Sequence, residues 1–223
     1  MIVHTARVIR IGAWNLAHER NASPMVLKRQ LDFIEPVGCD IWLLTEVPYT
    51  FRTVMGAQDT VLSDAMDRTH KAFAAVWARE GVEEEPSVHE AAAVARVGAL
   101  RVCSCLLPSP QIAVAQWPDE NHDRAARMRT TVGRLQCGLA HGRGDLVWGG
   151  DWSHPCAADD AAADRQLVAE AVAALGLRRA VRDVPHIAVP EGWDVGGGWR
   201  VEAVSQDGGR LSPHDAFVVE VEP

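Results

Sequence analysis

The sequence twice follows the order of a strand, a helix and a second, apolar strand that carries a carboxylate. In the first half, residues 7–16 alternate between apolar and polar side chains, which is typical of a β-strand. A helix is predicted to begin at Ser23–Pro24 and to end at Gly38, because serine followed by proline favours a helix start and glycine favours a helix end. Residues 40–47 then form a dense apolar run around Glu46, as expected of a strand buried on both faces.

The second half returns to this plan without repeating the residues themselves. Residues 99–107 are predicted to form a strand, residues 119–139 a helix, and residues 145–152 a buried strand that runs out at Asp151. Each half therefore resembles a βαβ unit. The pattern indicates an α/β protein with one carboxylate at a strand end in each half.

The segments between and after these units complete one predicted domain that spans residues 1–223, because no linker divides the chain. Residues 72–78 and 91–97 are predicted to form a pair of strands, joined by a loop whose Glu83–Glu84–Glu85 run is typical of a solvated tip. The other predicted elements are an alanine-rich helix over residues 157–176 that ends at Gly176, strands over residues 186–189, 199–204 and 215–222, and a turn over residues 207–209.

Composition and charge exclude several classes of protein. A chain of 223 residues is long enough for one domain with a sizeable core, and no segment approaches the apolar length of a membrane span. The net charge of −8 argues against a protein that grips long duplex DNA over its whole surface, although a bound cation could supply positive charge locally. The five cysteines lack metal-like spacing, so we expect reduced, mostly buried thiols in a cytoplasmic protein with no membrane contact.

Four short polar segments stand where apolar strands run out, which is where α/β folds build their sites. They are Trp14–Asn15, Leu44–Thr45–Glu46, Gly150–Asp151–Trp152–Ser153 and Ser212–Pro213–His214. In this order and spacing they resemble the motifs of the endonuclease/exonuclease/phosphatase superfamily, and the resemblance extends over nearly the whole chain. It implies a four-layered α/β sandwich, with two central mixed β-sheets flanked by helices.

The resemblance also implies a role for each matching residue. Glu46 corresponds to the glutamate that binds Mg²⁺ or Mn²⁺, and Asn15 to the asparagine that helps to place the metal and the phosphate. Asp151 corresponds to the aspartate that orients the attacking water, and Ser153 stands where the family has an asparagine. His214 corresponds to the histidine that contacts the scissile phosphate and supports acid–base chemistry.

The departures from the family pattern fall on supporting residues. Pro213 and Pro185 each replace an aspartate, and Leu106 stands where family members carry histidine or tyrosine. Loss of a carboxylate that orients a catalytic histidine lowers turnover roughly 10⁴-fold in the serine-protease triad. Asp183 or Asp215 could take over this task; Asp183 would face the same side of its strand as Pro185, whereas Asp215 should point away from its neighbour His214.

These residues predict a metal-dependent phosphoesterase, with a phosphodiesterase or nuclease preferred to a monoesterase. The substrate would be nucleic acid, a nucleotide or a small phosphorylated metabolite. Two alternatives stay open: a family member without catalysis that binds a nucleotide, nucleic acid or protein, and a phosphatase of small metabolites. The sequence leaves the substrate, the metal and the oligomeric state undetermined.

Overall fold

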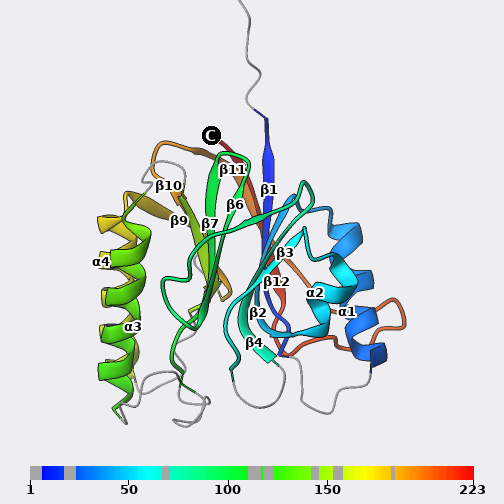
Figure 1. Ribbon diagram of the computed structural model, residues 1–223, viewed down its shortest axis with the longest axis horizontal. Coiled ribbons are helices and arrows are strands. Elements are labelled where there is room, and N and C mark those ends of the chain that lie inside the picture. Colours follow the sequence, from blue (N-terminus) through cyan, green and yellow to red (C-terminus); the bar gives the residue numbers. More distant parts are fainter. Residues whose placement is uncertain are drawn as a thin grey trace, which may run out of the picture.

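Two six-stranded mixed β-sheets pack face to face in the computed structural model, with helices on both outer faces (Figure 1). Helices α1 (Pro24–Val37) and α2 (Thr50–Met55) cover one sheet, and α3 (Arg124–Leu139) and α4 (Ala158–Ala174) cover the other. The predicted four-layered sandwich is therefore confirmed. The residues that the structure describes are 7–17, 24–66, 71–109, 117, 123–141, 146–152, 158–181 and 184–223.

The first sheet, which we call sheet A, joins the two ends of the described chain. Its strand order is β11-β12-β1-β2-β4-β3. The strands are β1 (Ile9–Asn15), β2 (Ile41–Pro48), β3 (Thr60–Leu62), β4 (Lys71–Ala78), β11 (Asp194–Val201) and β12 (Ala216–Glu222). Strands β1 and β2 are parallel and β12 pairs antiparallel with β1, so the segment before β12 returns to the carboxyl end of β1.

The second sheet, sheet B, is built from the middle of the chain in the order β5-β6-β7-β8-β10-β9. Its strands are β5 (Glu83–Glu84), β6 (Ala92–Val97), β7 (Leu100–Leu106), β8 (Leu146–Asp151), β9 (Leu177–Val181) and β10 (His186–Pro190). Strands β7 and β8 are parallel, like β1 and β2. Both predicted strand–helix–strand units are thus present, one in each sheet.

The predicted pairing of residues 72–78 with residues 91–97 is wrong. The two segments form β4 and β6, but β4 pairs with β2 and β3 in sheet A, whereas β6 pairs with β5 and β7 in sheet B. The chain crosses between the sheets here. Both strands are apolar on both faces, so their pattern does not reveal which neighbour each one takes.

The predicted solvated loop tip is also wrong for Glu85. Glu83–Glu84 form strand β5, and the Glu85 carboxylate lies 2.9 Å from an Arg96 guanidinium nitrogen and 2.6 Å from Arg101 Nε. This acid therefore anchors the crossing segment to sheet B instead of extending into solvent.

Several boundaries differ from those predicted. Helix α3 begins at Arg124, because the Asp123 side chain accepts a hydrogen bond from the backbone N–H of Ala125 and so caps the helix. Strand β11 begins at Asp194, earlier than expected, since a glycine-rich run hides its alternation. The short elements α2, β3 and β9 were not predicted. None of the described helices is long and apolar enough to cross a membrane.

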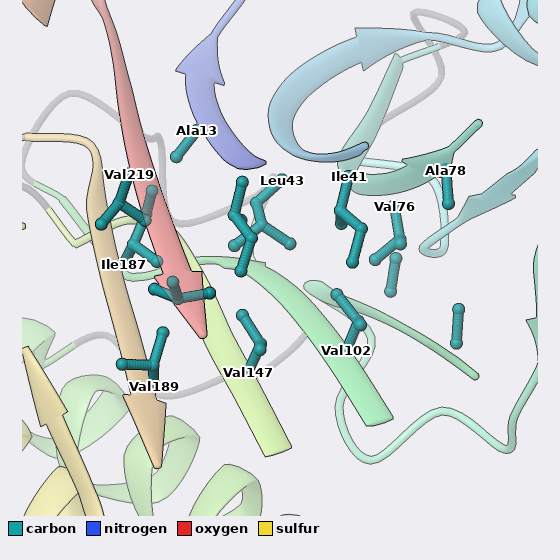
Figure 2. Packing of buried hydrophobic residues seen from close by; sticks show 14 of the residues in the cluster. Ala13, Ile41, Leu43, Val76, Ala78, Val102, Val147, Ile187, Val189 and Val219 are labelled. Atoms are coloured by element: carbon teal, nitrogen blue, oxygen red, sulfur yellow. The ribbon is translucent and has the colours of Figure 1, made fainter. Parts of the chain in front are cut away.

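The main hydrophobic core lies between the two sheets (Figure 2). Ile41, Leu43 and Val76 of sheet A face Val102, Val147 and Ile187 of sheet B, and all are nearly inaccessible to solvent. Two further clusters fill the spaces between each sheet and its helices; they are centred on Trp14 and Trp42 beneath α1, and on Trp148 and Trp152 beneath α3 and α4. Most of the tryptophans thus pack in the core, as predicted.

Thiol chemistry provides a first test of this packing. Cys39, Cys103 and Cys105 are buried and Cys137 is exposed, and none of these four described cysteines is in a disulfide. Burial raises the pKa of the Cys39 and Cys105 thiols to about 12, and the thiolate is the reactive form. We expect iodoacetamide at neutral pH to alkylate Cys137 and spare the three buried thiols, whereas urea exposes all four. Peptide mapping by mass spectrometry would read this out; alkylation of Cys103 in the folded protein would contradict the fold.

Candidate active site

Two carboxylates from different sheets meet on the side chain of Asn15. Asn15 is the last residue of β1, Glu46 lies near the end of β2, and Asp151 is the last residue of β8. The Asn15 amide nitrogen donates to Glu46 Oε1 at 3.0 Å and to Asp151 Oδ2 at 2.6 Å. Three residues that the sequence singled out are therefore in direct contact, although 136 positions separate the outer two along the chain.

The orientation of the Asn15 amide is fixed by its other end. Asn15 Oδ1 accepts a hydrogen bond from the backbone N–H of Ala17 at 2.8 Å. Because that oxygen receives a donor, the amide nitrogen must face the two carboxylates. In this orientation Asn15 positions the carboxylates through its N–H groups. Its predicted contribution to metal binding stays a prediction.

The sheets approach each other closely at this edge because small residues line it. A Cβ added to Gly149 would lie 2.5 Å from Leu43 Cδ1 of the opposite sheet. Ser104 Oγ donates to the backbone carbonyl of Leu44 at 2.9 Å, again between the sheets. This close approach brings strand ends of both sheets within reach of one amide group.

Glu46 adopts an unusual backbone conformation. Its φ of 51° is in the left-handed region, which is unfavourable for a residue with a long side chain. The pairing of β2 with β4 runs through Thr45 and Val47 but omits Glu46, so the strand is interrupted at this residue. Such strain of about 1–3 kcal/mol is concentrated at functional sites. The conformation therefore supports a functional role for Glu46.

Lys71 is a site residue that sequence reasoning missed. Its ammonium nitrogen lies 3.2 Å from Glu46 Oε2, and the side chains are 16% and 22% exposed. Lys71 begins β4 directly after residues that lie outside the described part of the chain. It belongs to no motif, and only knowledge of the β2–β4 register, in which it pairs with Pro48, would have revealed it.

Asp151 is held by its backbone in a buried position. It is 2% exposed and pairs with Leu106 in the parallel register of β7 and β8. The preceding Gly150 has a φ of 121°, and a Cβ there would lie 2.1 Å from the Cys105 carbonyl oxygen. Glycine is therefore required before Asp151, and the two residues turn the end of β8 toward Asn15.

His214 reaches the same end of β1 through its backbone. Ser212 Oγ donates to the backbone carbonyl of Asn15 at 2.7 Å and accepts from the backbone N–H of His214 at 3.1 Å. The Trp14 indole N–H in turn donates to the His214 carbonyl at 3.0 Å. The segment from Ser212 to His214 is thus fixed beside the carboxylates, and the catalytic role of the imidazole stays a prediction.

Of the substituted positions, Leu106 and Pro185 are buried and Pro213 is exposed. Leu106, next to Asp151 in register, belongs to a buried cluster with Met66, Phe73 and Trp117. His186, which follows Pro185, is buried with its ring 5.2 Å from that of Trp152. Trp152 itself is fully buried and also contacts Trp148, so it packs in the core as expected.

Of the two candidate replacements for the missing aspartate, Asp215 is committed elsewhere. It pairs with the guanidinium groups of Arg200 and Arg210 and accepts a hydrogen bond from the backbone N–H of Ala203 at 3.1 Å, so these groups occupy its carboxylate; its orientation relative to His214 stays a prediction. Burial alone would raise the pKa of Asp215, but these hydrogen bonds and charges outweigh burial and lower it. Asp183 and Ser153 lie outside the described residues.

The lowered pKa of Asp215 makes a prediction about stability. A carboxylate whose pKa falls on folding stabilises the protein above the unfolded pKa, and that stability is lost as the pH falls. We expect Asp215→Asn to reduce the free energy of unfolding by about 1–3 kcal/mol at pH 7, and the difference to shrink as the pH falls through 3.8, the ordinary value. Urea unfolding at several pH values would measure it, with the exposed Asp194→Asn as control. A difference independent of pH would contradict the ion pairs.

The donor set at this site fits a divalent cation. Two carboxylates, one buried and one partly exposed, offer the hard oxygen ligands that Mg²⁺ and Mn²⁺ prefer. Mg²⁺ is commonly held by one or two carboxylates, with water and substrate phosphate filling the remaining positions. Within the described residues no group of three or more His, Cys, Asp or Glu side chains could hold a metal. Of the two carboxylates, Glu46 is the residue that would hold it, with Asp151 beside it on the same Asn15 amide.

Comparison with known proteins agrees with this architecture. No protein-family model matches the sequence, and a search of curated proteins gave no match. Among solved structures the chain is similar to the endonuclease domain of TRAS1, a telomere-specific non-LTR retrotransposon, at 15% identity and a TM-score of 0.66, covering 97% of this chain and 99% of that one.

Two further structures are similar over the same extent. One is a D. rerio TDP2 humanized by 14 mutations, at 11% identity and a TM-score of 0.61; 97% of this chain and 99% of that chain are covered. The other is an endonuclease/exonuclease/phosphatase from Bacteroides vulgatus, at 13% identity and a TM-score of 0.65, with 97% and 99% covered. With two mixed sheets in the order described, this protein has the endonuclease/exonuclease/phosphatase fold.

Proposed function

We propose that this protein is a metal-dependent phosphodiesterase whose site is formed by Glu46, Asp151, Asn15 and His214. The observation that carries the proposal is the convergence of two carboxylates, one from each sheet, on the Asn15 amide nitrogen. Like charges are rarely held together in a partly buried place without a use, because their repulsion opposes folding. The solved structures of the same fold include an endonuclease domain, and this supports phosphoester chemistry.

The chemistry follows from the charge of the substrate. A phosphodiester is an anion and repels an incoming hydroxide, so hydrolysis requires positive charge at the phosphate and a base near the water. A divalent cation, when bound, would neutralise the phosphate and acidify a water. The protein's own residues then have separate tasks. Glu46 holds the cation, and Asp151 accepts a hydrogen bond from the attacking water and so orients it.

Asn15 and His214 complete the proposed arrangement. Asn15 fixes the separation of the carboxylates, because one nitrogen donates to both. The His214 backbone is tied to the end of β1 through Ser212, which places this residue on the same edge. Its imidazole would donate a hydrogen bond to a non-bridging phosphate oxygen, where negative charge develops in the transition state.

The surface charge favours a small or single-stranded diester over long duplex DNA. The net charge is −8, and many of the arginines are engaged with acids, which leaves them less available to phosphates. The ion-paired arginines are Arg7, Arg10, Arg29, Arg52, Arg96, Arg101, Arg124, Arg129, Arg134, Arg200 and Arg210.

One observation favours the second candidate, a binding module without turnover. Leu106 fills the position beside Asp151 where the family carries histidine or tyrosine, and it packs with Phe73 and Trp117. The site therefore lacks one polar group for the phosphate. A protein of this kind would bind a phosphoester in the presence of metal and release it unchanged.

Hydrolysis of three substrates would test the proposal. Bis-p-nitrophenyl phosphate, p-nitrophenyl phosphate and supercoiled plasmid should be incubated with the protein in Mg²⁺, in Mn²⁺ and in EDTA. We expect turnover of the diester with metal, less of the monoester, little nicking of plasmid, and none in EDTA. Asp151→Asn keeps the shape of the side chain and removes its charge, so it is the control for contaminating activity. Equal turnover by the wild type and this variant would reject the enzyme proposal in favour of binding.

A further inference from the structure

Lys71 stands out in a chain that uses arginine almost throughout. Among the 22 basic residues only Lys28 and Lys71 are lysines, which leaves 22 − 2 = 20 arginines. Lys28 is exposed on α1 and pairs with Asp32 one turn away. Lys71 is the lysine at the candidate site, with its ammonium nitrogen 3.2 Å from Glu46 Oε2. An ammonium is a compact charge on a flexible stem, unlike the planar guanidinium of arginine.

Each carboxylate oxygen of Glu46 accepts a hydrogen bond from a different donor. Oε1 accepts from Asn15, and Oε2 faces the Lys71 ammonium. A divalent cation takes carboxylate oxygens at about 2.0–2.1 Å in the case of Mg²⁺. An ammonium already in contact with Glu46 would repel a cation that enters at this carboxylate, and the repulsion is strong because both groups are largely withdrawn from solvent.

We propose that Lys71 is an internal counter-cation of the site, which holds Glu46 in the metal-free protein and must leave Oε2 when a divalent cation binds. The inference rests on the proposed function, since it assumes that Glu46 is the metal ligand. Lys71 then weakens metal binding. When no metal is bound, its charge neutralises the carboxylate of the strained Glu46. Its flexible stem allows the ammonium to move away while the backbone of β4 stays in place.

Metal affinity gives the first test. Isothermal titration with Mn²⁺ at fixed pH would compare the wild type with Lys71→Met, which keeps the length and removes the charge. We expect Lys71→Met to bind Mn²⁺ at least about tenfold more tightly, because one unit of repelling charge is gone. Lys28→Met makes the same charge change at an exposed position of α1 that pairs with Asp32, and it should bind like the wild type. In a Glu46→Gln background the effect of Lys71→Met should disappear.

The rarity of lysine allows a second test on the wild-type side chains. Reductive methylation with ¹³C-formaldehyde labels the two lysines and the α-amino group, and the Lys71 signal is the one absent from Lys71→Met. Diamagnetic Mg²⁺ should shift the Lys71 methyl resonance and leave that of Lys28 unchanged. This measurement needs no turnover, and the metal titration itself is made on the wild-type side chains.

The outcomes separate this inference from the proposed function. If Mn²⁺ binds equally to the wild type and Lys71→Met and the Lys71 resonance does not shift, the counter-cation role is wrong while the metal site stands. If neither the wild type nor Lys71→Met binds Mn²⁺, the metal site itself is wrong and both proposals fall. Tighter binding by Lys71→Met together with a selective Lys71 shift supports both.

Discussion

Replacement of Glu46 by glutamine is expected to lower metal-dependent turnover of a phosphodiester at least about 1000-fold. The amide keeps the size of the side chain but removes the charge that would hold the cation, and a lost metal ligand weakens transition-state stabilisation by several kcal/mol. A tenfold change in rate corresponds to about 1.4 kcal/mol, so a loss of about 4 kcal/mol gives this factor. Initial rates with bis-p-nitrophenyl phosphate at saturating Mn²⁺ would measure it.

The same substitution should leave the fold intact. Glu46 is partly exposed, and glutamine can adopt its backbone conformation no worse than glutamate does. We therefore expect the free energy of unfolding to change by less than about 1 kcal/mol. Glu35→Gln, at an exposed position of α1, is the matched control and should retain full activity. Activity retained by Glu46→Gln, within a factor of about ten of the wild type, would place the metal elsewhere.

Among the glycines that the structure describes, replacement of Gly150 by alanine is expected to be the most destabilising, because an added Cβ makes its shortest contact there. The new Cβ would lie 2.1 Å from the Cys105 carbonyl oxygen and 2.8 Å from its backbone nitrogen. These are backbone atoms of β7, which is paired on both sides with β6 and β8 and cannot move aside. The φ of 121° adds strain for any residue with a Cβ. Together the clash and the strain should reduce the free energy of unfolding by about 3–5 kcal/mol.

Urea unfolding followed by tryptophan fluorescence would measure this loss. Gly133→Ala is the matched control, because Gly133 lies inside α3 and a Cβ there meets nothing within 4 Å. Alanine in a helix interior is favoured over glycine by about 1 kcal/mol, so this variant should be more stable than the wild type. If Gly150→Ala instead unfolds at the wild-type urea concentration, the backbone geometry that presents Asp151 is wrong.

The sequence was sufficient to predict the two strand–helix–strand units and the strand ends that carry the carboxylates. Hydrophobic periodicity, together with glycine and proline at helix ends, marks these elements locally. Glu46 and Asp151 were identifiable because each interrupts a long apolar run, and the order of the motifs connected them. The structure then confirmed the fold and brought Asn15 into contact with both.

Other features depend on contacts that no local pattern encodes. The assignment of β4 and β6 to different sheets depends on which neighbour completes each strand, and both strands are equally apolar. Lys71 acquires its position from the register between β2 and β4. The orientation of the Asn15 amide depends on the backbone N–H of Ala17, which ordinarily has no signature in a sequence.

The close approach of the sheets at Gly149 and Ser104 means that core volume sets the spacing of the two carboxylates. Glu46 and Asp151 belong to different sheets, so neither strand alone determines their separation. The side chains packed between the sheets fix the distance between the two carboxylates. A methyl group added or removed at Leu43 or Ile187 would alter the distance between the sheets and, through it, the geometry presented to a phosphate. Fully buried aliphatic residues that never contact a substrate could thus adjust which substrate fits. Selection for activity would then act on the identity of core residues as well as on surface residues.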